Sequence, residues 1–357
     1  MPITQILKQN YSGKQVQSLA ELTRETELQM PSLKEMFDIV PNIKGKQKVG
    51  YIGGLEKITR KDEGCGSQGM SVTPPSREVL WNPTGFKVHI EECYKDWMNS
   101  WLEWGLKNGI QKQNLTTDEY FLFLTELIGE AIQKDFFRYV LFGNKNHSVV
   151  GSGSGTAVLT AGENPVNFNL MDGLFAKMDA FGTANASKRY TITANNGANF
   201  TAQRNLAADE GMKIAEFLLD NADGRMFGQG ADPYILMTWS LAQNLKRYMR
   251  ETYKNEMTFD KVEGGFQISE FDGVRLVTHR YIDHILRRDF SNGTKWDRPH
   301  RAFLLDRNNE RVGVDSESSF TDIEAEYIGG RDEKNHIKAS YLADYQRPYQ
   351  EFAVVAY

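Results

Sequence analysis

GFKVHIEECYKDWMNSWLEWGLKNGIQKQNLTTDEYFLFLTELIGEAIQKDFFRYVLFG, residues 85–143, is the stretch of sequence that decides the fold. From Thr116 onward, apolar side chains recur every three or four residues, which is the repeat of one helical face. These apolar positions are Tyr120, Leu124, Leu127, Ile128, Ala131, Ile132, Phe136 and Val140. The spacing predicts one helix over 116–142, of about 27 residues and about 40 Å, more than twice the average globular helix.

Both ends of the predicted helix carry terminal signals. Thr116 or Thr117 can cap the first turn, where Asp118 and Glu119 lie at the positive end of the helix dipole. Gly143 stands where a residue of left-handed conformation is expected to close the helix. A long, rigid helix without a catalytic motif beside it favours a structural subunit over an enzyme.

Composition excludes several classes of protein. The chain has 357 residues, 40% of them hydrophobic and 25% charged, which is enough for one large core or two. A formal net charge of −5 argues against a protein that coats nucleic acid, although DNA can still be a neighbour. The two cysteines, Cys65 and Cys93, are expected to be unpaired cytosolic thiols. No apolar run approaches the roughly 18 residues of a membrane span, and no secretory signal is present, which predicts a soluble protein made in the cytoplasm.

The segments before the long helix do not look self-sufficient. Residues 1–48 are polar, with apolar side chains near the end that need a surface from elsewhere, which predicts an arm packed on other subunits. Two extended limbs, near 48–52 and 85–90, enclose a middle rich in glycine and charge. That middle cannot form a core, so the sequence predicts a loop that protrudes and is ordered by a partner.

After the helix, helices alternate with strands, which predicts a mixed α/β domain followed by a run of strands. The Gly-Ser run Gly151–Gly155 is expected to be a flexible connector. Helices are expected at 169–181, capped by Asn169 and closed by Gly182, and at 205–220 and 240–253. Strands are expected at 190–193, 234–237, 273–278, 302–305, 323–327, 337–341 and 352–357.

Three patterns have the appearance of a reactive site. His279 and His284 are five residues apart instead of four, without the glutamate of a helical zinc motif, so a strand end and its turn is the ordinary interpretation. Gly151–Gly155 matches Gly-x-Ser-x-Gly, but no apolar helix follows it, as a nucleophile elbow requires. No phosphate-binding loop and no dinucleotide fingerprint is found.

Two groups of charged residues are candidate sites. The acidic group shows no spacing that fixes a carboxylate pair, so solvated faces are expected; it comprises Asp306, Glu310, Asp315, Glu317, Asp322, Glu324 and Glu326. The basic group is interleaved with Tyr281, Phe290 and Trp296, and it comprises Arg280, Arg287, Arg288, Lys295, Arg298 and Arg301. Such a mixture can grip nucleic acid or form Arg–carboxylate pairs between subunits, and the negative overall charge favours the second.

The order of these parts resembles the major capsid proteins of tailed bacteriophages, which have the Hong-Kong-97-type fold. The resemblance covers nearly the whole chain and lies in the architecture, without one diagnostic motif. The matching pieces are the arm, the extended loop with its return strand Phe86–Ile90, the long helix ending in YVLFGN (139–144), MDGLF (171–175) and FDGVRLV (271–277).

The resemblance implies an α+β chain with an N-terminal arm, an extended β-hairpin loop, a peripheral domain and an axial α/β domain. The implied boundaries are 1–48 for the arm, 49–90 for the extended loop, 91–200 for the peripheral domain with its spine helix 116–142, 201–320 for the axial domain, and 321–357 for strands that return to both domains.

The function that the resemblance implies is a structural subunit that assembles into the icosahedral capsid around the double-stranded DNA genome of a tailed phage. Implied partners are copies of the chain in pentamers and hexamers, a portal, a separate scaffolding or decoration protein, and packaged DNA held without sequence specificity. Because the arm begins almost at Met1, a fused scaffold is not expected. The implied location is the virion, after assembly in the host cytoplasm.

Two alternatives stay open. An encapsulin-like shell that houses cargo enzymes has the same architecture. A soluble hydrolase that uses His279, Asp283 or His284 is the third choice, because the residues that would orient such a site are missing. The sequence therefore predicts no enzyme, and it assigns no catalytic, metal or cofactor-binding residue.

Overall fold

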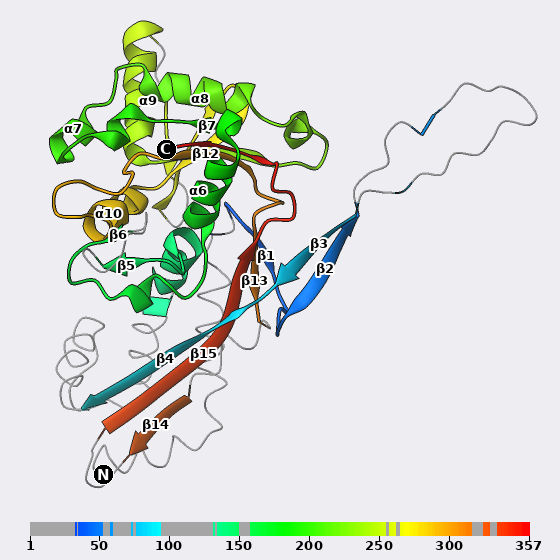
Figure 1. Cartoon of the computed structure of the whole chain (residues 1–357), viewed down its shortest axis with the longest axis vertical. Coiled ribbons are helices and arrows are strands. Elements are labelled where there is room, and N and C mark those ends of the chain that lie inside the picture. Colours follow the sequence, from blue (N-terminus) through cyan, green and yellow to red (C-terminus); the bar gives the residue numbers. More distant parts are fainter. Residues whose placement is uncertain are drawn as a thin grey trace, which may run out of the picture.

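The computed structural model describes residues 33, 35–52, 58–59, 73, 76–93, 131–132, 134–149, 158–254, 257–261, 265–315, 324–328 and 334–357. A body of two sheets and their covering helices carries a two-stranded hairpin that projects from one side (Figure 1). Most of the predicted arm, the tip of the extended loop, the first half of the predicted long helix and the Gly-Ser connector lie outside the described residues.

A seven-stranded sheet forms the centre of the upper part of the body. Alternate residues of its strands enter different cores: Tyr234 and Leu236 face one side, whereas Ile235 and Met237 face the other. Burial on both faces explains why the strands read as continuous apolar runs. In spatial order the strands are β7 (Arg189–Tyr190), β16 (Ala353–Ala356), β12 (Ala302–Asp306), β8 (Pro233–Met237), β11 (Val274–Thr278), β10 (Gln267–Phe271) and β9 (Asp260–Lys261).

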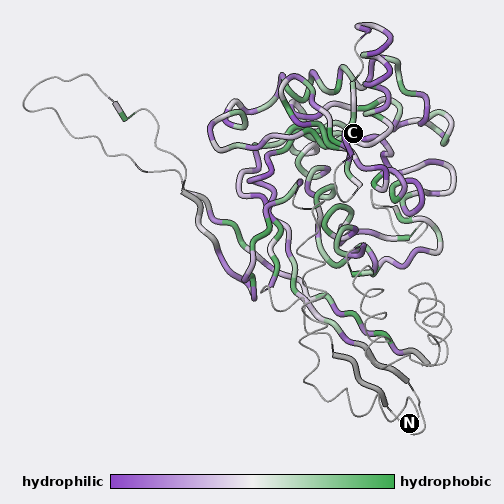
Figure 2. The backbone as a smooth tube through the Cα atoms, turned by 180° about the vertical axis from the view of Figure 1, so that it is seen from behind, coloured by the Kyte–Doolittle hydropathy of each residue, from purple (hydrophilic) through white to green (hydrophobic). Residues whose placement is uncertain are grey.

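Helices cover both faces of this sheet. On one face pack α8 (Glu210–Asp220) and α9 (Trp239–Thr252), and on the other α6 (Leu174–Ala184), α10 (Arg280–Asp289) and the helical residues 134–142. Figure 2 shows the apolar strands enclosed between more polar helices. The remaining short helices are η1 (Pro165–Asn167), η2 (Ala186–Lys188), η3 (Thr193–Asn196), α7 (Phe200–Arg204) and η4 (Gly224–Phe227).

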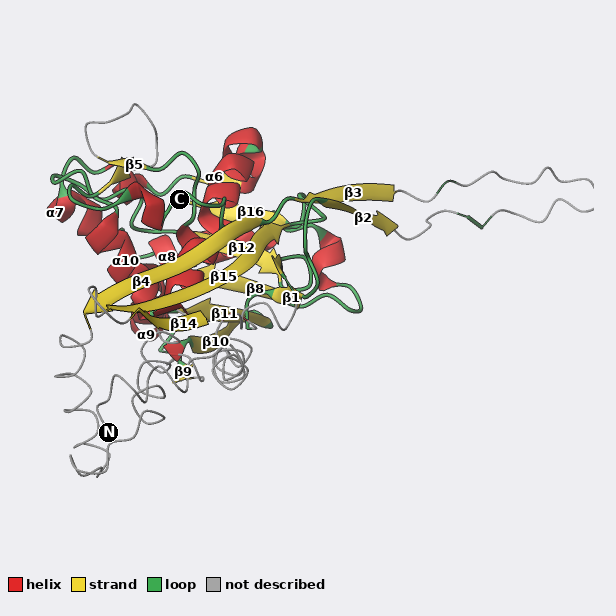
Figure 3. Cartoon of the chain, turned by 90° about the horizontal axis from the view of Figure 1, so that it is seen from below, coloured by secondary structure: helices red, strands yellow, loops and turns green. Residues whose placement is uncertain are grey.

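The second sheet is built around one 13-residue strand, β15. Along one edge β15 pairs antiparallel with β4 over ten residues, from Lys334 opposite Cys93 to Ala343 opposite Thr84. Figure 3 shows these two long strands side by side. The strands of this sheet are β1 (Asp38–Val40), β13 (Arg311–Val314), β15 (Lys334–Gln346), β14 (Glu324–Ile328) and β4 (Thr84–Cys93).

The projecting hairpin pairs β2 (Gln47–Ile52) with β3 (Ser76–Trp81). Phe86–Ile90 is not the return strand that the sequence predicts for this hairpin, because those residues belong to β4 and pair with β15. Asn82 and Pro83 separate β3 from β4, and the chain then enters the larger sheet. A further small parallel pair joins β5 (Ser148–Val149) to β6 (Val158–Leu159).

The helix before β5 ends at Phe142, where the sequence places its end, and its predicted start lies outside the described residues. Gly143 does not have the left-handed conformation expected of it. Its missing side chain instead permits close packing, because a Cβ atom there would lie 2.5 Å from both the Tyr139 and the Met171 carbonyl oxygens. The glycine is therefore required by a backbone contact between distant segments.

Helix α6 differs from its prediction at both ends. It begins at Leu174, with Gly173 as its N-cap, so Asn169 does not cap it. Gly182 lies inside the helix and does not close it. A Cβ atom at Gly182 would lie 2.6 Å from the Tyr357 hydroxyl, so close packing against that ring explains the glycine.

Residues 33–48 belong to the folded body rather than to an arm that depends on other subunits. Leu33, Met36 and Phe37 are buried in the main core, and β1 pairs with β13. The Tyr234 hydroxyl donates a hydrogen bond to the Met36 carbonyl at 3.0 Å. The predicted arm, residues 1–48, thus includes a later part that packs against its own chain.

Candidate assembly site

The hairpin is fixed to the body by the side chain of Trp81, which is 1% exposed. The indole packs on Gly313 of β13, where a Cβ atom would lie 2.5 Å from the ring, and beside Ile43. The next residue, Asn82, donates its backbone N–H to Asp344 of β15 at 2.8 Å. These contacts set the direction in which the hairpin leaves the body.

Among the described side chains of the hairpin beyond its base, Val79 is buried and the others are exposed. Leu80 is 52% exposed, and the Lys48–Glu78 ion pair at 2.9 Å is solvated, so it contributes little stability. A two-stranded hairpin standing alone in water is marginally stable at best. The geometry is therefore that of an element that a partner surface completes.

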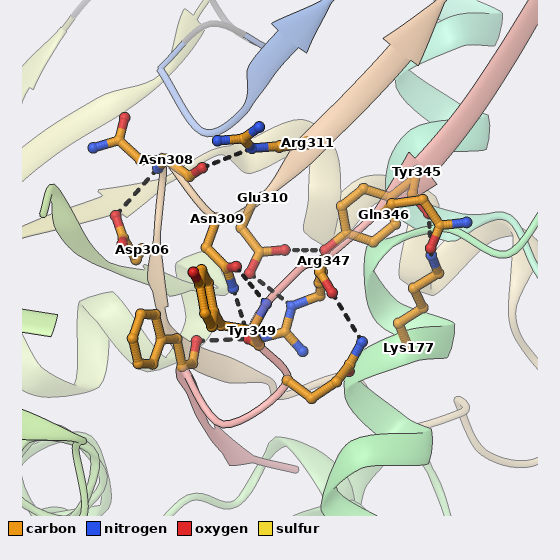
Figure 4. A network of polar contacts seen from close by, with 12 residues as sticks. Lys177, Asp306, Asn308, Asn309, Glu310, Arg311, Tyr345, Gln346, Arg347 and Tyr349 are labelled. Carbon is orange, nitrogen blue, oxygen red and sulfur yellow. Dashed lines mark hydrogen bonds and ion pairs between the residues drawn. The ribbon is translucent and has the colours of Figure 1, made fainter. Parts of the chain in front are cut away.

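A fully buried ion pair lies where the two sheets meet. Arg347 donates from Nε to Glu310 at 2.7 Å, and both side chains are 0% exposed (Figure 4). The Tyr345 hydroxyl donates to the other Glu310 oxygen. Burial raises the pKa of Glu310, and the Arg347 charge opposes that rise. We take the pair as ionised, because each charge has the other as a hydrogen-bonded partner.

Neighbouring contacts extend this junction. Asn309 and Tyr349 exchange two hydrogen bonds, of 2.8 and 2.9 Å, between an amide side chain and the backbone. Lys177 of α6 donates to the Tyr345 carbonyl, and burial lowers the pKa of this lysine to about 8. The junction thus joins the β12–β13 turn, the end of β15 and α6, as Figure 4 shows.

Two members of the acidic group, Asp306 and Glu310, do not lie on the solvated faces that the sequence predicted, whereas Glu317 and Asp322 lie outside the described residues. Asp306 and Glu310 are buried, and Asp306 accepts hydrogen bonds from the Asp232 and Asn308 backbone at 3.1 Å each. A spacing rule could not detect this, because Arg347, the partner of Glu310, and Asp232, one of the two partners of Asp306, are distant in the sequence.

Several members of the basic group have partners within their own chain, whereas the sequence favoured pairs between subunits, which remain a prediction. Asp179 of α6 forms ion pairs with Arg298 at 2.9 Å and with Arg301 at 3.0 Å. The guanidinium of Arg280 lies 4.2 Å from the centre of the Trp239 ring. Several of these cations therefore attach α10 and the following loop to the body.

His279 directly follows the end of β11, as the sequence predicted, but a helix, α10, begins where a turn was expected. His279 caps α10 by accepting the Tyr281 N–H at 3.0 Å. Asp283 accepts the Trp239 and Ser240 N–H groups at 2.7 and 3.2 Å, so it caps α9, and burial raises the pKa of this carboxyl. Among the described residues, no three His, Cys, Asp or Glu side chains gather as a metal site.

His300, which no motif singled out, is 2% exposed within a polar network. Its Nε2 lies 2.8 Å from the Gln203 carbonyl and must donate to it, so Nδ1 accepts the Ser240 hydroxyl at 2.7 Å. Burial lowers the pKa of His300 below its usual 6.5. Neutral imidazole is thus the form that the fold requires.

We expect the protein to lose stability as the pH falls below about 6.5, since unfolded His300 binds a proton there and the folded form does not. Urea denaturation of the unassembled subunit at pH 7.5 and 5.5 measures this loss. His300→Gln should flatten the dependence, and His284→Gln, at an exposed position, should not. An equally steep dependence in both variants would contradict the assignment.

Comparison with solved structures shows where this arrangement of elements occurs. A chain of the satellite phage P4 procapsid that includes the size determination (Sid) protein is 12% identical, with a TM-score of 0.51; the match covers 95% of this chain and 98% of that chain. A chain of Gordonia phage Cozz is 12% identical, with a TM-score of 0.50, over 92% and 85%. The chain has a phage capsid fold.

This capsid fold extends over nearly the whole length of both phage chains. The SrpI encapsulin complex from Synechococcus elongatus PCC 7942 also matches, at 10% identity and a TM-score of 0.47, over 93% and 88%. No family model matches the sequence, and no curated protein is similar to it. Within the described residues, no helix is both long and apolar enough to cross a membrane.

Proposed function

We propose that the chain is the structural subunit of an icosahedral capsid that encloses the double-stranded DNA of a tailed phage. The observation that carries the proposal is the capsid fold shared with two phage particles over nearly the full length of each chain. The projecting hairpin, anchored at Trp81 but otherwise little supported, adds to it.

The finer assignments belong to the same proposal. The seven-stranded sheet and its helices would be the axial domain, the β4–β15 sheet with the long helix the peripheral domain, and β2–β3 the base of the extended loop. Pentamers and hexamers, a portal, a separate scaffolding or decoration protein, and DNA on the inner face are the proposed partners. The virion is the proposed location, with assembly in the host cytoplasm.

The two alternatives receive less support. An encapsulin-like shell is not favoured, because chains of two phage particles match this chain at TM-scores of 0.51 and 0.50. A hydrolase would need His279 and Asp283 for chemistry, yet both act as helix caps. An enzyme would sediment as a small oligomer, and a cargo shell would carry protein in place of DNA.

Replacing residues 53–75 by Asn-Gly tests the hairpin directly. Ile52 pairs with Ser76, so a two-residue turn can close the strands without changing their register. We expect the wild-type chain to form megadalton shells, and the shortened chain to remain folded but sediment as free subunits or small oligomers. Analytical ultracentrifugation and negative-stain microscopy measure this, with circular dichroism as the folding control. Normal closed shells from the shortened chain would contradict the role of the hairpin.

A further inference from the structure

A groove of about 1080 Å³ opens between α8, α9 and the β10–β11 hairpin, at the end of the seven-stranded sheet where β11 begins. Its apolar lining includes Met212, Leu219 and Met249. Methionine is flexible and polarisable, so a surface that contains several methionines adapts to the side chains that pack on it. The groove therefore has the lining of a docking surface.

The rim of the groove is acidic. The single cation in the lining, Arg275, already pairs with Glu35 at 2.8 Å and lies 3.6 Å from Asp232. The rim thus attracts a cationic surface and repels an anionic one. Within the described part of the chain, no cation forms an ion pair with the five exposed carboxylates of the rim, which belong to Glu216, Asp220, Asp260, Glu270 and Asp272.

Exposed cations gather at the opposite end of the same sheet, where β11 ends. Arg280 begins α10 two residues after the end of β11, and Arg287 lies about two turns further along this helix. Helix α7 lies at the same side of the body as α10 (Figure 3), and the Trp296 ring is 5.6 Å from the Arg287 guanidinium and 5.2 Å from that of Arg204. Lys295 precedes this tryptophan. We call Arg204, Arg280, Arg287 and Lys295, all of them exposed, the basic face.

The basic face is only partly compensated by carboxylates of its own chain. Among the described residues, no carboxylate forms an ion pair with Arg204, Arg280 or Lys295, and Asp283 lies 3.9 Å from Arg287. The parallel strands β8 and β11 separate this face from the groove, because β11 alone spans about 17 Å. One copy therefore cannot bring its own groove and basic face together, whereas two copies can.

We propose that the basic face of one copy docks in the acidic groove of a second copy, head to tail. This inference rests on the proposed function, which requires that copies of the chain associate. The arginine stems would cover the methionines, and the guanidinium groups would reach the carboxylates of the rim. Since each copy carries both surfaces, the contact repeats from copy to copy, and it closes into a ring where the rotation between copies permits. Packaged DNA would account for the basic face but not for the carboxylates of the groove, and a second copy accounts for both.

Charge reversal in the full-length chain tests this contact, with association measured by sedimentation velocity at low and high salt. Glu216→Lys with Asp220→Lys, in the groove, should weaken association about tenfold, because attraction becomes repulsion. Arg204→Glu with Lys295→Glu, on the basic face, should weaken it to a similar extent. The variant that combines all four substitutions keeps the net charge of −5 and should recover most of the association. High salt should weaken the wild type and relieve the repulsion in both pair variants.

Lys46→Glu with Lys87→Glu is the matched control, because both lysines are exposed and lie outside the groove and the basic face. It changes the net charge as much as the basic-face variant does, and it should associate like the wild type. Circular dichroism reports that each variant stays folded.

Association that ignores both pair reversals, or that the fourfold variant fails to restore, would overturn the proposal. A basic-face variant that associates normally and only loses bound DNA would also overturn it, because nucleic acid would then be the partner. A wild-type chain that shows the expected charge dependence but never closes into shells would contradict the proposed function and leave this contact standing. A wild-type chain that stays monomeric would contradict both.

Discussion

Arg347→Met should lower the free energy of unfolding by about 3–5 kcal/mol, because it leaves the Glu310 carboxylate buried without its partner. Guanidinium denaturation of the unassembled subunit measures the loss. Burial already raises the pKa of Glu310, and removing the arginine raises it further. A carboxyl group whose pKa is higher in the folded than in the unfolded state lowers the stability of the fold at pH values at which the unfolded group is ionised. The deficit of the variant should therefore shrink as the pH falls.

Two further variants separate the buried pair from ordinary surface charge. Arg307→Met removes an arginine that is 39% exposed and pairs with Asp232, so it should cost less than about 1 kcal/mol. Adding Glu310→Leu to Arg347→Met should recover much of the loss, because no uncompensated charge remains. A deficit that is independent of pH and unrelieved in the double variant would show that packing, not charge, dominates at this site.

Trp81→Ala should lower the free energy of unfolding by about 3–5 kcal/mol, because the indole packs in the core. It should also stop assembly, because the same side chain anchors the hairpin to the body. The cavity left against Gly313 and Ile43 removes the contact that sets the direction of the hairpin. Denaturation measures the first effect, and negative-stain microscopy at a temperature where the variant stays folded measures the second.

Leu80→Ala is the matched control, since the neighbouring side chain is 52% exposed and its loss should cost less than about 1 kcal/mol. Trp81→Phe should keep part of the packing and some assembly. If Trp81→Ala formed closed shells as efficiently as the wild type, the direction of the hairpin would not depend on the packing of Trp81.

Local patterns in the sequence were enough to predict most regular elements. The apolar runs 234–237 and 302–305 are strands, and the helix around 240–253 follows its strand as expected. The end of the long helix at Phe142 also agrees. These elements could be predicted because a helix with one buried face has a regular repeat of apolar residues, and a fully buried strand has a short continuous apolar run.

What the sequence did not reveal depends on contacts between distant residues. The partner of β2 is β3 instead of Phe86–Ile90, because pairing is decided by where each strand finds a free edge. Gly143 and Gly182 are glycines because other parts of the chain pack closely against them. A local rule instead interprets each of them as the end of a helix. Glu310 looks solvated in sequence, since Arg347 is 37 positions away.

The position of β16 has a consequence for biosynthesis. Residues 353–356 lie inside the seven-stranded sheet, between β7 and β12, and not at its edge. The sheet therefore cannot form completely until the ribosome has translated the chain through Ala356. Nascent polypeptides on one messenger RNA would therefore lack a complete seven-stranded sheet while they are still tethered side by side.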